Sequence, residues 1–263
     1  MIDRKALLAD LQKQVKALEA DLREQVNTES EIAQPLRTEY DTAFRLGRTA
    51  DTWRAWSDER ITQAAVAWVL GTVFVRFCED NGLLKRLFLA GPTSESLIVA
   101  EESEAEYFRT ADDPTLRGWL LQSFAALATG QAGRSLFDER HNPLYGIPIS
   151  HDGAKALVAF WRGRAESGEL VHRFDDPNWN TRFLGDLYQD LSESARKRYA
   201  LLQTPEFVEE FILDRAMTPA LQLFGHESFK MIDPTCGSGH FVLGAFHRLL
   251  AVWVAESLTC IGW

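Results

Sequence analysis

The residues with the clearest chemical potential lie near the end of the chain, in the stretch Asp233-Pro-Thr-Cys-Gly-Ser-Gly-His-Phe241. A short apolar run with strand character, Phe229 to Ile232, precedes the aspartate, and an apolar helical pattern follows from Phe241 to about Val254. A strand, a glycine-rich turn and a helix form the opening unit of a nucleotide-binding α/β sheet. The carboxylate of Asp233, at the end of the predicted strand, favours a ligand that carries an ammonium group or hydroxyls over one that carries phosphates.

The glycine spacing excludes two common phosphate-binding turns. After Gly237 and Gly239 the next glycine is Gly244, which does not fit the dinucleotide pattern G-x-G-x-x-G. No G-K-[ST] sequence occurs, so the chain has no P-loop. A tight strand-to-helix turn without a ligand is the structural alternative. A stretch of nine residues with a Cys-Gly-Ser-Gly core indicates a ligand-binding turn far more specifically than a lone G-x-G does. It therefore favours a turn that binds a ligand.

The stretch Asp233–Phe241 resembles the S-adenosylmethionine motif of the N6-adenine DNA methyltransferases, D-P-x-C-G-S-G-x-F. The resemblance extends upstream, where 183–189 followed by Thr204, Pro205 and Val208 is similar to the family segment L-G-x-L-Y-Q … T-P-x-x-V. Judged from residue types alone, this second segment is a well-capped helix start, with threonine as the N-cap and proline at the first helical position. Two motifs in the right order, with room for one helix and one strand between them, make chance agreement improbable.

The resemblance implies that S-adenosylmethionine is the cofactor and that the turn glycines wrap it. It also implies that the aspartate contacts the methionine end of the cofactor and that the Thr-Pro turn lines the methionine pocket. The cofactor-binding residues predicted in this way are Thr204, Pro205, Asp233, Thr235, Gly237, Gly239 and Phe241, the last packing beneath the turn.

The same resemblance implies site-specific transfer of a methyl group to the N6 amino group of adenine in double-stranded DNA. The last third of the chain is most similar to the methyltransferases of BREX-type phage-resistance systems, which mark host DNA against phage in the manner of restriction-modification. In such enzymes the amino nitrogen of a flipped base attacks the sulfonium methyl group in line, and this chemistry needs no metal. Other phage-defence proteins are expected partners.

Several parts of such an enzyme are missing from these 263 residues. The family holds the flipped base with a [DNS]-P-P-[YFW] tetrapeptide, and Asn142-Pro-Leu-Tyr145 lacks the second proline. Its neighbours Gly146, Pro148 and Ser150 are typical of a surface turn, so we interpret it as structural. No catalytic residue is therefore predicted. The further strands of a methyltransferase sheet are also absent, which predicts an N-terminal fragment of a longer enzyme, or a broken reading frame, that is inactive alone.

Composition limits the function classes. The chain is 46% hydrophobic with a net charge of −10, the wrong sign for a protein that mainly grips nucleic-acid phosphates. Its three cysteines are far apart and odd in number, which fits a reducing cytoplasm. Neither C-x-x-C nor H-E-x-x-H occurs, so no metal site is predicted. We expect no signal peptide and no membrane span, because the longest apolar run, Ala64–Val75, is too short.

The first two thirds of the chain predict helices. Leucines and valines at 3-4-3-4 spacing indicate an amphipathic helix over 3–30, closed by Pro35 and docked on its own domain or on a partner. A broad apolar band predicts a central helix within Asp58–Leu89, and further helices are expected at 116–127 and 154–164. The acidic stretch 91–114 is predicted to be an irregular, solvated segment with some helix.

Two details of this region carry functional alternatives. Glu79 and Asp80 close the central helix before Gly82, and we interpret them as an exposed helix end rather than a metal or catalytic pair. Two tryptophans, Trp53 and Trp56, stand beside Arg48 and Arg54, which is weak support for a contact surface.

The predicted architecture is a mainly α N-terminal domain (1–195) followed by the first strand-turn-helix unit (196–263) of a Rossmann-like α/β S-adenosylmethionine-dependent methyltransferase domain, here truncated. A second hypothesis from another class is a helical interaction module of a defence complex without catalysis of its own. A nuclease fused to the methyltransferase is disfavoured, because neither an E-x-K tripeptide nor a Pro-Asp pair occurs.

Overall fold

The computed structural model describes residues 3–28, 30–112, 114–175, 184, 187, 190–191, 204, 206–236 and 239–260. The chain divides into two compact units. The N-terminal unit comprises Met1–Trp179 with Asp190–Ser194, and the C-terminal unit comprises Asn180–Gln189 with Ala195–Trp263. The predicted domain boundary at 195 lies outside the described residues.

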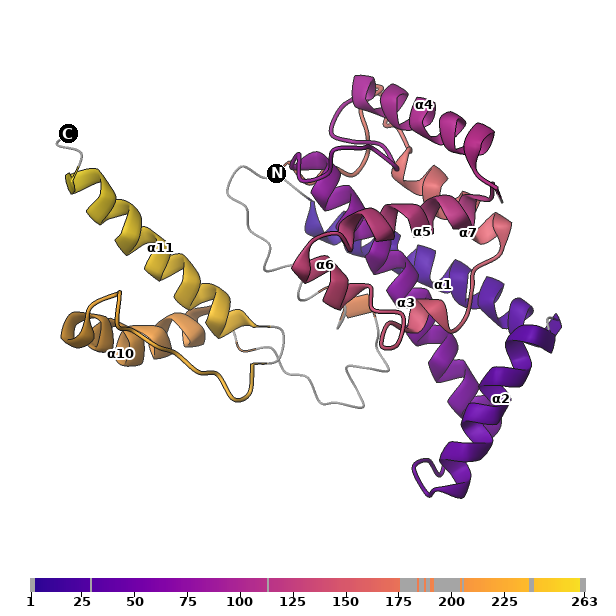
Figure 1. Ribbon diagram of the computed structural model, residues 1–263, viewed down its shortest axis with the longest axis horizontal. Helices are drawn as coiled ribbons and strands as arrows, with labels where there is room; N and C mark the ends of the chain where they lie inside the picture. The colour runs from indigo at the N-terminus through magenta and orange to yellow at the C-terminus, as the bar shows by residue number, and fades with distance from the viewer. Residues whose placement is uncertain are drawn as a thin grey trace. The chain divides into compact units, whose positions relative to one another are not determined.

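Helices make up almost all the regular structure of the described residues. In the N-terminal unit they are α1 (Arg4–Thr28), α2 (Ser30–Arg45), α3 (Trp53–Asp80), α4 (Ser94–Thr110), α5 (Leu116–Leu127), α6 (Gln131–Leu136), the 3-10 helix η1 (Pro143–Tyr145) and α7 (His151–Trp161) (Figure 1). The C-terminal unit contains α10 (Glu206–Phe224) and α11 (His240–Cys260). The described ranges contain no strand, only an isolated antiparallel bridge between Arg164 and Leu170. The prediction of a mainly helical N-terminal domain is thus confirmed.

The N-terminal unit is built around α3. Thr52 caps this helix, since its hydroxyl oxygen accepts a hydrogen bond from the amide of Ala55, and the helix ends before Gly82, whose φ is +66°. Helices α1, α2, α5 and α7 and the 3-10 helix η1 all contact α3. Because neighbours surround it, α3 buries residues on every side, as a core helix does. The predicted central helix is confirmed, and it begins five residues earlier than expected.

By length and apolar character alone, α3 could cross a membrane. Its most apolar stretch, with a mean hydropathy of 1.5, is 67% buried inside the unit. The expectation from Ala64–Val75 considered only the continuous apolar run, whereas the whole helix is 28 residues long. Burial of the apolar surface against neighbouring helices accounts for this composition without a bilayer.

Helix α1 packs along α3 through an apolar stripe, which confirms the prediction that it is a docked amphipathic helix. The stripe is completely or almost completely buried and consists of Leu7, Leu11, Val15, Leu18, Leu22 and Val26. Leu8, which follows the first residue of this stripe, is only half-buried. The partner of α1 is therefore its own domain.

Two predictions for the N-terminal unit are wrong, one about the end of a helix and one about the structure of an acidic segment. Pro35 does not end a helix but lies inside α2, where burial of Leu36 and Tyr40 compensates for the lost backbone hydrogen bond. Most of the acidic stretch 91–114 is not irregular but forms α4, which begins with a capping box between Thr93 and Ser96.

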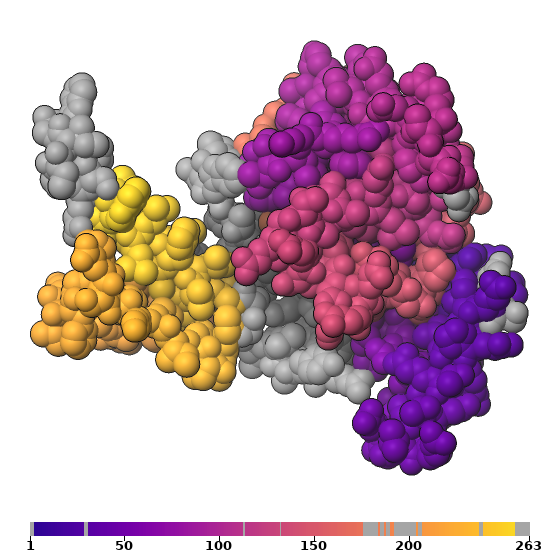
Figure 2. Space-filling model, viewed as in Figure 1, coloured from indigo at the N-terminus to yellow at the C-terminus, as the bar shows by residue number. Residues whose placement is uncertain are grey.

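The end of α2 and the loop after it project from the rest of the unit (Figure 2).

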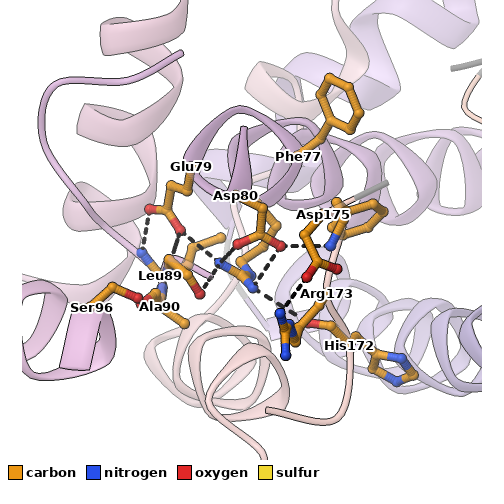
Figure 3. A network of polar contacts seen from close by, with 12 residues as sticks. Phe77, Glu79, Asp80, Leu89, Ala90, Ser96, His172, Arg173 and Asp175 are labelled. Carbon is orange, nitrogen blue, oxygen red and sulfur yellow. Dashed lines mark hydrogen bonds and ion pairs between the residues drawn. The ribbon is translucent and has the colours of Figure 1, made fainter. Parts of the chain in front are cut away.

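Charged side chains are buried at the C-terminal end of α3 (Figure 3). Arg76 is fully buried, and its guanidinium lies 3.1 Å from a carboxylate oxygen of Glu79 and 2.9 Å from one of Asp80. The side chains of both acids are also 0% exposed. The prediction that these two acids form an exposed helix end is therefore wrong. Spacings of three and four residues place both on the same face as Arg76, and this face points inward.

The carboxylate of Glu79 organises the loop after α3. Its two oxygens accept hydrogen bonds from four consecutive backbone amides, those of 88–91, at N···O distances of 2.5 to 3.1 Å. The carbonyls of the same loop accept hydrogen bonds from Trp119, from Arg162 and from Arg76 itself. One buried carboxylate thus supplies acceptors for amides that no helix or strand satisfies.

Asp80 connects the same centre to the segment after α7. Its carboxylate accepts a hydrogen bond of 2.7 Å from the amide of Phe174, and the Arg76 guanidinium donates to the carbonyl of His172. Asn81 donates to the carbonyl of Phe174. Burial raises the pKa of Asp80 to about 6, although the neighbouring Arg76 guanidinium opposes this rise. The network is structural, since its hydrogen bonds hold backbone segments together.

Removing the cation at the centre of this network should destabilise the N-terminal unit strongly. Arg76→Met would leave Glu79 and Asp80 buried without their counter-charge, and we expect the free energy of unfolding to fall by about 3–5 kcal/mol. Urea titration followed by circular dichroism measures this change. Arg140→Met removes the same charge from an arginine that is 80% exposed beside Asp138, and it should leave the unfolding midpoint nearly unchanged. Equal stability of the two variants would contradict the central role of Arg76.

The raised pKa of Asp80 predicts a pH dependence of stability. The folded state holds this proton more tightly than the unfolded chain does, so the stabilisation is complete below about pH 3.8 and is lost as the pH rises through about 6. Comparison of Asp80→Asn with the wild type at several pH values isolates this contribution. The wild type should lose on the order of 1–3 kcal/mol relative to the variant across this window. A difference that does not change with pH would refute the assignment.

Candidate cofactor-binding site

The first predicted motif lies at the start of α10. Thr204 stands two residues before this helix and is half-buried, while Pro205 lies outside the described residues. The helix runs from Glu206 to Phe224 and passes through Pro219. Five further helical residues follow this proline, and Gly225, with a φ of +71°, ends the helix.

Helices α10 and α11 pack against each other and form a small core. Leu213 and Met217 of α10 are buried against Ala245 of α11. Partly buried apolar side chains pack around this cluster, namely Leu221, Phe229, Phe241 and Leu249. Phe241, which the sequence placed beneath the cofactor turn, therefore contributes to the contact that holds the turn on α10.

Residues later in α11 contact residues later in α10. Near the start of α11, a Cβ added to Gly244 would lie 2.2 Å from a carboxylate oxygen of the buried Glu209. One turn later Arg248 pairs with Asp214 at 2.6 Å and lies 3.4 Å from the hydroxyl of Thr218. The helices are therefore roughly parallel. Their N-terminal ends, which carry the two predicted motifs, lie at the same end of the pair (Figure 1).

The turn between the helices contains an aspartate with one unsatisfied oxygen. Oδ1 of Asp233 accepts hydrogen bonds from the amide of Thr235 at 3.0 Å and from its hydroxyl at 3.4 Å. Oδ2 is buried and has no hydrogen-bond partner among the described residues. Such an atom is costly unless a donor reaches it, so the arrangement fits a ligand that brings an N–H or O–H group.

Gly239 gives the turn its exit into α11. Its φ is +84°, a value that side chains other than glycine rarely adopt. Its amide donates to the carbonyl of Cys236 at 2.7 Å, and its own carbonyl accepts from the amide of Leu243 at 2.8 Å. Gly239 thus closes the turn and begins the hydrogen bonds of the helix. Gly237 lies outside the described residues.

The strand predicted before Asp233 is not formed in the described residues. The segment 229–233 is irregular, with Ile232 87% exposed and Met231 41% exposed. A strand requires a hydrogen-bonded neighbour, and no described segment lies alongside as one. The structure therefore supplies the turn and the helix of the predicted strand-turn-helix unit, but not its strand.

The predicted site residues are thus partly assembled. Asp233 and Thr235 are hydrogen-bonded to each other, Gly239 and Phe241 follow at the start of α11, and Thr204 lies at the same end of the helix pair. The buried Glu209, which lies against Gly244 of α11, was missed. Its spacing of four and eight residues from Leu213 and Met217 placed it on the face of α10 that contacts α11, and this signal was available in the sequence.

The sequence Asn142-Pro-Leu-Tyr145 is a structural turn, as predicted. The Asn142 side-chain oxygen accepts a hydrogen bond from the amide of Leu144, and its amide group donates to the carbonyl of Leu136. Leu144 is fully buried against α3. The polar atoms that would hold a base are therefore engaged in holding the turn. The residues that the structure describes contain no cluster of three or more metal-ligating side chains.

Comparison with known proteins relates the sequence to the adenine-specific methyltransferases. Over 257 residues, or 95% of this chain, it is 65% identical to the curated adenine-specific methyltransferase PglX of Streptomyces coelicolor. The chain spans 21% of that relative's length. No family model matches the chain, and no solved structure matches it. The resemblance inferred from Asp233–Phe241 is confirmed, and the assignment of single residues to the cofactor stays a prediction.

Proposed function

We propose that this chain is part of an S-adenosylmethionine-dependent DNA methyltransferase that acts on the N6 amino group of adenine. In this proposal, the α10–α11 pair carries the cofactor side of the active site. The observation that carries the proposal is the buried Oδ2 of Asp233 in the turn before α11, which has no hydrogen-bond partner among the described residues. The similarity to an adenine-specific methyltransferase over 95% of the chain supports the reaction class.

The residues of the turn fit the cofactor. Oδ2 of Asp233, for which the described part of the chain supplies no donor, would accept a hydrogen bond from the ammonium group at the methionine end. A carboxylate at this position favours a cationic ligand. The positive φ at position 239 favours glycine, which has no side chain, so that Gly237 and Gly239 would contact the cofactor through their backbones. Thr204 and Pro205 would line the methionine pocket from the start of α10.

When bound, the cofactor supplies an electrophilic methyl group on a sulfonium sulfur. The contribution of this chain would be to position that group. Asp233 fixes one end of the ligand, Thr235 holds Oδ1 of Asp233 and thereby orients the carboxylate, and Phe241 anchors the turn to the core with Leu213. None of these residues removes a proton in this proposal.

The remaining functions of the enzyme would come from sequence outside this chain, which spans about a fifth of its relative. These functions are gripping of the flipped base, catalysis and recognition of the DNA target. Many large apolar side chains of α10, α11 and the loop between them are exposed, and we propose that the missing sheet covers them. They include Phe207, Phe211, Leu223, Ile232, Phe246 and Trp253.

The biological setting follows from the same resemblance. We propose that the substrate is double-stranded host DNA, and that methylation serves BREX-type antiviral defence in the cytoplasm, alongside other phage-defence proteins. The net charge of −10 supports the proposal that most of the DNA contact lies on other parts of the enzyme.

The second candidate function is an interaction module without catalysis. The exposed apolar side chains of the C-terminal unit favour it, because such surfaces commonly mark sites of protein association. Helix α1 no longer supports it, since its apolar stripe is buried within its own unit. The two candidates differ in whether the turn binds the cofactor.

Calorimetric titration of the 263-residue chain with S-adenosylmethionine tests the proposal. We expect saturable binding that Asp233→Asn weakens about tenfold or more, because it removes a charged hydrogen-bond acceptor. The control is Glu227→Gln, which makes the same charge change at an exposed residue in the loop after α10 and should bind as the wild type does.

Equal affinity of the two variants would reject Asp233 as a cofactor ligand. No binding by a wild-type chain that circular dichroism shows to be folded would favour the interaction module for this part of the enzyme.

A further inference from the structure

A hollow of about 660 Å³ lies where α1, α2 and α3 meet. Its volume is in the range of small-molecule sites. The three helices contact one another, and they can be followed in Figure 1. Each contributes side chains to the wall of the hollow. The lining residues are Arg23, Val26, Asn27, Ala33, Gln34, Arg37, Trp53, Arg54, Ser57, Asp58 and Ile61. The hollow belongs to the N-terminal unit and is separate from the cofactor turn.

The charge of this hollow is opposite to that of the whole chain. Its wall contains three arginines and one aspartate, in a protein with a net charge of −10. The aspartate, Asp58, lies 3.0 Å from Arg23, and both side chains are about half exposed, so this pair contributes little to stability. Arg37 lies 3.4 Å from Asp41, also at an exposed position. An anionic ligand could therefore compete for both guanidinium groups.

Arg54 is unusual in its position. It is the second residue of α3, whose first turn contains no acid, although the positive end of the helix dipole favours acids and disfavours arginine there. Arg54 is exposed, and its guanidinium makes no ion pair or hydrogen bond with another described residue. A sequence that opposes a local stability rule often does so at a functional site. An anion bound in the hollow would interact favourably with both the arginine and the start of the helix.

Trp53, in the wall of the hollow, restrains the guanidinium of Arg37. The Arg37 guanidinium lies 4.9 Å from the ring centroid of Trp53, and this ring stacks on Trp56 with a centroid separation of 5.9 Å. Tyr40 packs edge-on against Trp53 from α2. Arg37 is thus held in place before a ligand arrives, which reduces the entropic cost of binding. The more exposed apolar part of the wall, which includes Ala33 and Trp53, would contact an uncharged part of the ligand.

We propose that this hollow binds a nucleotide phosphate, either of a free nucleotide or of a DNA strand. Guanidinium groups bind phosphate oxygens through pairs of hydrogen bonds, and three arginines suit a dianion or successive phosphates better than a single carboxylate. Arg54 and Arg37 contact the phosphate, and the apolar wall contacts the sugar or base. The site does not require the proposed methyl transfer, and no residue of the cofactor turn takes part.

Arg54→Glu separates this role from a role in folding. The substitution places an acid in the first turn of α3, so it should preserve or raise the thermal unfolding midpoint while it reverses the charge in the hollow. Arg48→Glu is the matched control, since Arg48 is exposed in the loop before α3 and does not line the hollow. Binding is measured with the 263-residue chain at low salt, by calorimetry with AMP and by fluorescence anisotropy with a labelled short DNA duplex.

We expect the wild type to bind at least one of the two probes and Arg54→Glu to lose about tenfold or more in affinity, while Arg48→Glu loses much less. Binding of AMP identifies a free nucleotide as a ligand. Binding of the duplex alone, with a salt dependence that Arg54→Ala reduces by about one phosphate contact, identifies the DNA backbone. Failure of the wild type to bind either probe, or equal losses in the two glutamate variants, would overturn the proposal.

Discussion

The structure of the N-terminal unit depends on one desolvated cation. Arg76 lies inside the protein, where an unpaired charge would be prohibitively costly, so acidic partners must be buried with it. Glu79 and Asp80 meet this requirement and use their remaining oxygen sites to bind backbone amides of two other segments. In this way the end of the central helix determines the path of the 88–91 loop, to which Trp119 of α5 and Arg162 after α7 are hydrogen-bonded. Helices far apart in sequence are therefore held through one polar centre.

The C-terminal unit is organised differently. A few apolar side chains around Leu213 and Ala245 hold its two helices together, and many others remain exposed. Among the described residues no strand accompanies the turn, yet the turn itself is defined by Asp233 and Gly239. The unit has the features expected of one side of a site: a preformed polar turn, two helix starts at the same end and an apolar surface without a cover. These features agree with a chain that spans a fifth of its methyltransferase relative.

Sequence periodicity predicted the packed helices α1, α3 and α5 well, because their apolar positions repeat at helical spacing and burial follows directly from that pattern. It failed for Glu79 and Asp80, because acids at a helix end are usually solvated and the pattern does not show what lies beyond the helix. The sequence did contain one signal that these acids are paired, since Arg76 precedes Glu79 by three residues and Asp80 by four. The turn before α11 was predicted from its glycines, and its role in binding a cofactor stays a prediction. A strand cannot be confirmed without the partners that hydrogen-bond to it. The hollow beside Arg54 could not be predicted either, since three helices must assemble before it exists.

Amide hydrogen exchange of the 88–91 loop tests most directly whether the buried network organises the N-terminal unit. Outside any helix, such amides normally exchange quickly, whereas hydrogen bonds to the buried carboxylate of Glu79 should make these amides open only with global unfolding. We predict protection equal to that of the amides in the middle of α3. Exchange as rapid as that of the exposed loop after α10 would show that the carboxylate does not hold the loop, and it would contradict this account of the fold.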